Sequence, residues 1–83
     1  MTNLHKALRL IRIFHDTNQT RLAERLDISN SFLSEIESGK KSISIELLEK
    51  YAAVFDVPVS SIILFSEKLE SNTISEKTEK VLH

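Results

Sequence analysis

The sequence predicts an all-α protein, built as one compact domain of five helices. Apolar residues recur at three- and four-residue spacing through most of the first 69 positions, which is the periodicity of helices with one buried face. The chain has one Gly and one Pro, so few positions interrupt that pattern. Its 83 residues are enough for one small domain. We predict a domain over residues 1–69 and a polar tail or weak extra helix over residues 70–83.

The first helix is predicted from about residue 3 to residue 15. The positions expected on its buried face are Leu4, Leu8, Ile11 and Phe14. Several charged residues occupy the rest of the helix, so it should be amphipathic.

The segment from Gln19 to Gly39 predicts two short helices joined by a tight turn. The apolar face of the first contains Leu22, Ala23 and Leu26, and that of the second contains Leu33 and Ile36. Ser29 is expected to cap the start of the second helix, and Gly39 is suited to the left-handed position that ends it. This layout is typical of a helix-turn-helix, in which the second helix enters the major groove of DNA.

The fourth helix is predicted to begin near Ser44, which is expected to be its N-cap, and to end before Pro58. The fifth helix is predicted to begin near Ser60. The expected apolar stripe of the fourth contains Ile45, Leu48, Ala52 and Phe55, widened by Leu47, Tyr51 and Val54. The fifth contains an apolar run at positions 62–65, whose side chains point about 100° apart, so a monomer cannot bury them all. We therefore predict a homodimer whose interface consists of Leu47, Tyr51, Val54, Ile62, Ile63 and Phe65.

These residues resemble the Cro and lambda-repressor-like family, also called XRE-type regulators. The motif of that family has Gln at its first position, Ala at its fifth, and apolar residues at its fifteenth and eighteenth, which here are Gln19, Ala23, Leu33 and Ile36. The resemblance runs without a gap from about residue 8 to residue 57. The family usually has Gly where this chain has Asp16 and Asp27. Asp tolerates left-handed backbone geometry better than most residues, so we expect both turns to be kept.

The resemblance implies a lambda-repressor-like fold and a set of DNA contacts. The residues expected to face base edges are Asn30, Ser31, Phe32, Ser34 and Glu35. The residues expected along the DNA backbone are Asn18, Gln19, Ser29, Lys40 and Lys41. Some of these assignments have a structural alternative. Phe32 could fold into the core, Glu35 could be a solvated carboxylate or pair with a nearby Lys or Arg, and Asn18 could serve only as a helix cap. Lys40 and Lys41 could be solvated turn residues.

Similar proteins also join an Arg of the first helix to a Glu near the end of the recognition helix. The matching residues are Arg12 and Glu37. We predict a structural ion pair between them, since a guanidinium group matches a carboxylate in geometry.

Charge is distributed unevenly along the chain. Residues 1–41 carry seven basic and five acidic side chains, whereas residues 42–83 carry four basic and seven acidic ones. The positive half is therefore the half that contains the predicted helix-turn-helix.

Several other functions are not supported by the sequence. The chain has no Cys, and its three His residues lack partners at metal-ligand spacing. It has no Gly-rich phosphate loop or nucleophile motif, so we expect no enzyme activity, metal or cofactor. Charged residues interrupt the N-terminal apolar stretch, which argues against a signal peptide or membrane span and favours a cytoplasmic protein.

The function predicted from the sequence is sequence-specific binding to double-stranded DNA. We expect a homodimer on a palindromic operator, acting as a repressor of its own or a neighbouring promoter. Two alternatives remain at this stage: an antitoxin, whose tail would contact a protein partner, and a controller of a restriction-modification system.

Overall fold

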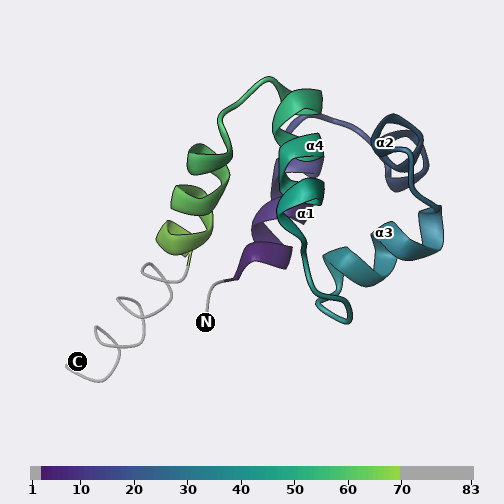
Figure 1. Ribbon diagram of the computed structural model, residues 1–83, viewed down its shortest axis with the longest axis horizontal. Helices are drawn as coiled ribbons and strands as arrows, with labels where there is room; N and C mark the ends of the chain where they lie inside the picture. The colour runs from purple at the N-terminus through teal and green to yellow at the C-terminus, as the bar shows by residue number, and fades with distance from the viewer. Residues whose placement is uncertain (1–2, 70–83) are drawn as a thin grey trace.

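A computed structural model describes residues 3–69 of the chain. It contains α1 (Leu4–Phe14), α2 (Gln19–Leu26), α3 (Asn30–Glu37) and α4 (Ile45–Phe55), followed by a fifth helix over residues 59–69 (Figure 1). No strand occurs within this part of the chain. The predicted all-α, five-helix fold is confirmed. The tail or extra helix predicted for residues 70–83 lies outside the described residues.

The helices are arranged around the pair formed by α2 and α3. These two helices pack against each other, α1 packs on α3, and α4 packs on α2. The ammonium group of Lys50 on α4 also donates to the carbonyl of Leu26 at the end of α2, at 3.2 Å. The fifth helix lies at the opposite end of the molecule from α2 and α3 (Figure 1). One end of the molecule is thus occupied by the helix-turn-helix.

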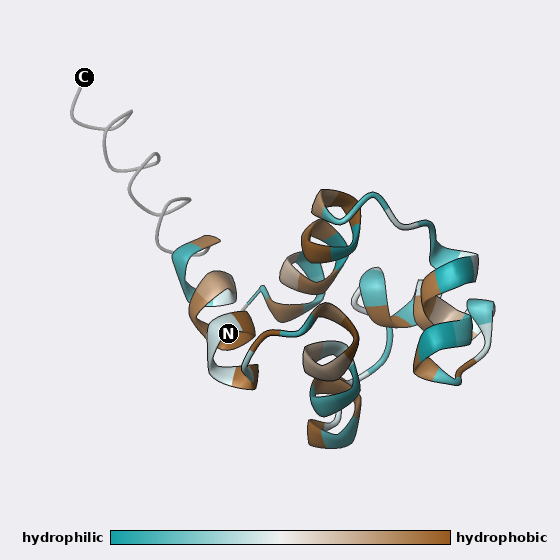
Figure 2. Cartoon of the chain, turned by 90° about the horizontal axis from the view of Figure 1, so that it is seen from above, coloured by the Kyte–Doolittle hydropathy of each residue, from teal (hydrophilic) through white to brown (hydrophobic). Residues whose placement is uncertain are grey.

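One hydrophobic core joins the helices. Each of them carries a hydrophobic stripe beside a hydrophilic one (Figure 2), and the buried side chains form a single cluster. The apolar positions predicted for the motif, Leu22, Ala23, Leu26, Leu33 and Ile36, are all in that cluster. Burial of apolar side chains of this size stabilises a fold by about 1.5–3 kcal/mol each.

Short polar side chains begin three of the helices. Asn18, Ser29 and Ser44 precede α2, α3 and α4, and in each case the side-chain oxygen accepts the backbone amide three residues further on. A cap of this kind contributes about 1 kcal/mol. The predicted caps Ser29 and Ser44 are confirmed.

Four helix ends share one backbone conformation. Asp16, Asp27, Gly39 and Asp56 have φ angles of 53°, 59°, 84° and 55°. The amide that follows each of them donates to the carbonyl five residues earlier, which is the bond of a Schellman motif. The left-handed geometry expected at Asp16, Asp27 and Gly39 is therefore present, and Asp56 adopts it as well.

Two residues predicted to be buried are exposed. Phe14 is 69% exposed and Ile45 is 68% exposed. Phe14 ends α1 and Ile45 begins α4. Helical periodicity assigns such residues to a face, but it does not tell how far along that face the neighbouring helix extends.

Three residues predicted at a dimer interface are buried within the monomer. Leu47, Tyr51 and Ile62 belong to the core cluster, so that part of the prediction is wrong. Leu47 and Tyr51 lie on the buried side of α4, and Ile62 is the residue of the apolar run that faces inward. Of the other three, Ile63 is exposed, while Val54 and Phe65 are half-buried.

Within residues 3–69, every helix is too short or too polar to cross a lipid bilayer.

Candidate nucleic-acid interface

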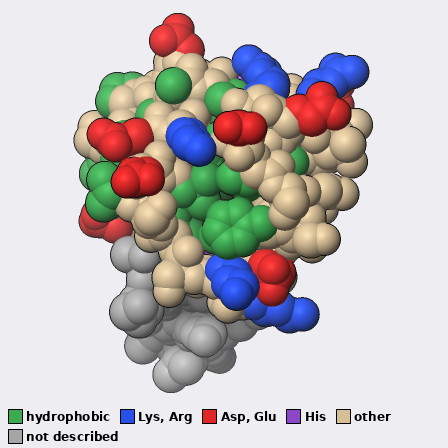
Figure 3. All heavy atoms as spheres, turned by 45° about the vertical axis from the view of Figure 1, so that its right-hand side comes forward, with side chains coloured by type: hydrophobic (Ala, Val, Ile, Leu, Met, Phe, Trp, Pro, Cys, Tyr) green, Lys and Arg blue, Asp and Glu red, His purple; other side chains and the backbone are tan. Residues whose placement is uncertain are grey.

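The side of α3 that faces away from the core presents mainly polar side chains to solvent. Asn30, Ser31 and Ser34 are exposed, Phe32 is 37% exposed, and Glu35 is half-buried. Leu33 and Ile36 point the other way, into the core. The face of the molecule seen in Figure 3 has hydrophobic side chains (green) near its centre, and Lys, Arg, Asp and Glu side chains (blue and red) lie around them. The five residues predicted to read bases therefore lie on one short helix, with its apolar side anchored.

The start of α2 offers free backbone amides beside the C-terminal end of α3, where Gln19 contacts Glu37. The side chain of Asn18 accepts the amide of Arg21 at 2.8 Å, and its carbonyl accepts the amide of Leu22. Within the described residues the amides of Gln19 and Thr20 form no hydrogen bond. Such amides carry partial positive charge and suit an anion. Asn18 is thus a helix cap, which is the structural alternative given above for this residue. The first turn of α2 still has two free donors, the backbone amides of Gln19 and Thr20.

The turn after α3 carries two lysines. Lys40 and Lys41 follow Gly39 and are both exposed. The amide of Lys40 closes the end of α3 by donating to the carbonyl of Glu35 at 2.9 Å. The backbone is therefore held while both ammonium groups remain in solvent.

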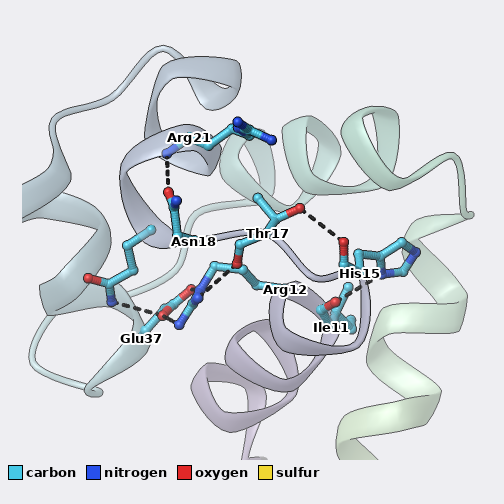
Figure 4. Close-up of polar contacts among 8 residues, drawn as sticks. Ile11, Arg12, His15, Thr17, Asn18, Arg21 and Glu37 are labelled. Carbon is cyan, nitrogen blue, oxygen red and sulfur yellow. Dashed lines mark hydrogen bonds and ion pairs between the residues drawn. The ribbon is translucent and has the colours of Figure 1, made fainter.

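A buried ion pair holds α1 against the end of α3. The Arg12 guanidinium donates from Nε to Oε2 of Glu37 at 2.8 Å and from a terminal nitrogen to Oε1 at 3.0 Å (Figure 4). A third Arg12 nitrogen donates to the carbonyl of Thr17 at 3.0 Å. The side chains of Arg12 and Glu37 are only 13% and 2% exposed. The predicted pair is present in bidentate form, and it fixes α1, the following loop and α3 together.

The side chain of Gln19 also belongs to this network. Its amide nitrogen donates to Oε1 of Glu37 at 3.0 Å, and the residue is half-buried. Sequence reasoning had assigned Gln19 to the DNA backbone. The structure directs one hydrogen of that side-chain nitrogen to a partner inside the protein, whereas the backbone amide of Gln19 forms no hydrogen bond within the described residues.

Tyr51 is close to the same network. Its hydroxyl is buried and forms no hydrogen bond with the part of the chain that is described. Burial raises the pKa of this hydroxyl well above its usual range, the Glu37 carboxylate raises it further, and Arg12 has the opposite effect. This interaction could not be predicted from the sequence, because it joins residues of α1, α3 and α4 that are far apart in the chain.

Two residues of α1 that lie near the end of α3, His5 and Arg9, were not predicted from the sequence. The imidazole of His5 covers Gly39 so closely that a Cβ atom there would lie 3.2 Å from Nε2 of the ring. Arg9, one turn further along, lines a shallow depression together with Gln19, Glu37 and Ser38. Only the spacing of four residues could have indicated that His5 and Arg9 share a face.

Known proteins with a similar sequence or structure include transcriptional regulators. The profile of the family described as helix-turn-helix (HTH_3) matches residues 8–62. A protein of Pyrococcus furiosus, PF1851, provisionally named an HTH-type transcriptional regulatory protein, is 33% identical over 76 residues. That match covers 90% of this chain but only 24% of the Pyrococcus protein.

Two crystal structures of the clp gene regulator ClgR from Corynebacterium glutamicum are similar in fold. The first has a TM-score of 0.82 and 28% identity, and the match covers 98% of this chain and 87% of the ClgR chain. The second has a TM-score of 0.75 and 30% identity, with 81% and 87% of the two chains covered.

Proposed function

This chain belongs to the XRE-type helix-turn-helix family, the Cro and lambda-repressor-like regulators, and from that membership we propose that it binds double-stranded DNA and regulates transcription. The observation that carries the proposal is the outer side of α3, where Asn30, Ser31 and Ser34 are exposed, while the other side of the same helix is buried in the core. A rigid helix with solvated amide and hydroxyl groups is suited to contact base edges in the major groove.

The proposed contacts divide into two classes. Asn30, Ser31, Phe32, Ser34 and Glu35 face base edges. Asn18, Gln19 and Ser29, through the turns they cap or begin, and Lys40 and Lys41, through their ammonium groups, face phosphates. The free amides at the start of α2 lie beside the end of α3, where Gln19 contacts Glu37, and Lys40 and Lys41 follow that same end. Anion-binding groups therefore gather next to the reading helix, which supports this division.

We propose that the protein acts as a homodimer, but with an interface different from that predicted by the sequence. Exposed apolar side chains remain on the fifth helix, where Leu64 is 57% exposed and Ile63 is also exposed. Phe14 of α1 is also exposed and lies next to Phe65 of the fifth helix, with the two ring centroids 6.2 Å apart. We define the apolar patch as Phe14, Ile63, Leu64 and Phe65. A second copy would cover it and remove these groups from water.

A dimer with a two-fold axis through this patch would bind a palindromic operator. Two recognition helices related by such an axis read two half-sites about one DNA turn apart, roughly 34 Å. A domain that occupies DNA regulates most simply by blocking a promoter, so repression of its own or a neighbouring promoter is the proposed outcome.

Selection of bound fragments from random duplex DNA tests the proposal. We expect recovery of one sequence with two inverted half-sites, and a mobility shift on that duplex that a scrambled duplex of the same length does not compete away. Recovery of fragments without a shared sequence would contradict specific binding. Recovery of a single half-site without symmetry would contradict the homodimer while leaving specific binding intact.

A further inference from the structure

Arg9 is a solvent-exposed cation placed where α1 meets the helix-turn-helix. It lines a depression of about 140 Å³ with three other residues: Gln19 at the start of α2, and Glu37 and Ser38 at the end of α3. This depression lies between the free amides of α2 and the turn that leads to Lys40.

The structure gives Arg9 no electrostatic partner within residues 3–69. The ion pair there joins Arg12 to Glu37, and both Glu37 oxygens already accept hydrogen bonds, from Arg12 and from Gln19. The charge of the carboxylate at this depression is therefore compensated without Arg9. The Arg9 guanidinium is therefore available to bind an anion from outside the protein.

We infer that Arg9 contacts a phosphate of the DNA backbone, as a positioning residue that adds to the contacts of α2 and of Lys40 and Lys41. This inference rests on the proposed DNA-binding function. The guanidinium group is planar and offers paired donors, which matches the oxygens of a phosphate. The partner is the backbone of duplex DNA, since the depression borders the surface proposed to face it. The contact fixes the position of α1 relative to the duplex and reads no base.

Salt-dependent binding to the selected duplex and to random DNA tests this inference, with Arg9→Ala as the main variant. Because Arg9 is exposed, the variant should keep the melting temperature of the unmutated protein. We expect its affinity for both DNAs to fall by the same factor, and the slope of log K against log salt concentration to fall by about 0.9 for each protomer bound. Arg9→Lys should restore most of that slope.

Arg25→Ala is the matched control, because Arg25 is also an exposed arginine but lies at the other end of α2. It should leave the salt slope unchanged. A lower melting temperature for Arg9→Ala with an unchanged salt slope would overturn the inference and make Arg9 a second counter-ion of Glu37. Unchanged binding, or a loss confined to the selected duplex, would overturn it as well. Failure of the unmutated protein to bind any duplex would instead contradict the proposed function itself.

Discussion

Glu37 is a single residue on which the position of the recognition helix depends. Its carboxylate is almost completely buried at the end of α3, and three side-chain donors from Arg12 and Gln19 surround it. A buried carboxylate is costly unless it is paired and hydrogen-bonded. Here the pairing also connects α1 and α2 to α3, so that a single charge determines how three elements are held.

We predict that Glu37→Ala lowers the free energy of unfolding by about 3–5 kcal/mol, because it leaves the guanidinium of Arg12 without its charged partner in a mostly buried site. This is a large part of the stability of a typical domain, about 5–15 kcal/mol. Urea unfolding measures the change. The control is Glu49→Ala, which removes an exposed carboxylate from α4 and should have little effect. Equal midpoints for the two variants would contradict the structural role of the pair.

A second prediction concerns the hydroxyl of Tyr51. Its pKa is raised in the folded protein, whereas in the unfolded chain it is about 10. Above pH 10 the unfolded chain therefore loses a proton that the folded protein keeps. The contribution of this group to stability is complete below pH 10 and falls as the pH rises, by about 1.4 kcal/mol per pH unit.

Tyr51→Phe should remove that alkaline loss. Near pH 7 it should change stability little, since the hydroxyl forms no hydrogen bond within the described residues. Urea unfolding of both proteins from pH 7 to pH 11.5 measures the difference. Tyr51 is the single tyrosine of the chain, so tyrosinate absorbance reports it directly. Parallel pH profiles for the two proteins would show that Tyr51 titrates normally.

At the scale of elements, the turns that separate the helices depend on residues in the left-handed backbone conformation. Asp27 ends α2 with a φ of 59°, and the turn it forms sets the entry into α3. A residue without a polar side chain adopts this conformation with difficulty, whereas Gly adopts it readily. A negative charge at a helix C-terminus is also unfavourable.

We predict that Asp27→Gly is more stable than Asp27→Ala by about 1 kcal/mol. The same pair of substitutions at Glu24, an exposed residue inside α2, should give the opposite order, because Ala favours a helix interior over Gly by about 1 kcal/mol. Thermal unfolding of the four variants provides the comparison. The same order at both positions would show that the conformation of Asp27 does not limit stability.

The recognition helix and the turn after it should respond differently to mutation. Asn30→Ala should cost about 1–3 kcal/mol on the selected duplex and little on random DNA, because a base contact is lost. Lys40→Ala should weaken binding to both and lower the salt slope by about one unit per protomer, because a phosphate contact is lost. Titrations at several salt concentrations separate the two classes. Equal losses of Asn30→Ala on both DNAs would remove Asn30 from the reading set.

At the scale of the whole molecule, the fifth helix, which carries Ile63, Leu64 and Phe65, and the helix-turn-helix lie at opposite ends (Figure 1). An interface at one end leaves the other free for DNA. Removing the exposed parts of these side chains from water, at about 25 cal/mol per Å² of apolar surface, would favour the association of two copies.

We predict that Leu64→Glu gives a folded monomer with much weaker affinity for a palindromic duplex, because Leu64 is exposed and its replacement leaves the core intact. Sedimentation measures the association. Ala53→Glu, an exposed position of α4 outside the apolar patch, should remain dimeric. A monomeric unmutated protein at high micromolar concentration would show that the patch is not a dimer interface.

The sequence by itself determined the parts of this protein that depend on residues close together in the chain. Helix boundaries, the caps at Ser29 and Ser44 and the left-handed turn at Gly39 each involve residues within about one turn of one another. Resemblance to a known family added the pair of Arg12 and Glu37, which helical periodicity alone could not have joined.

Only the tertiary structure decided which sides of the helices are covered. It placed Tyr51 and Ile62 in the core, left Phe14 in solvent, and turned the side chain of Gln19 toward Glu37. Periodicity gives the direction of a side chain around its helix axis, but the neighbour that meets it comes from a distant part of the chain. The apolar surface available to a second protomer could therefore be located only after the five helices were packed.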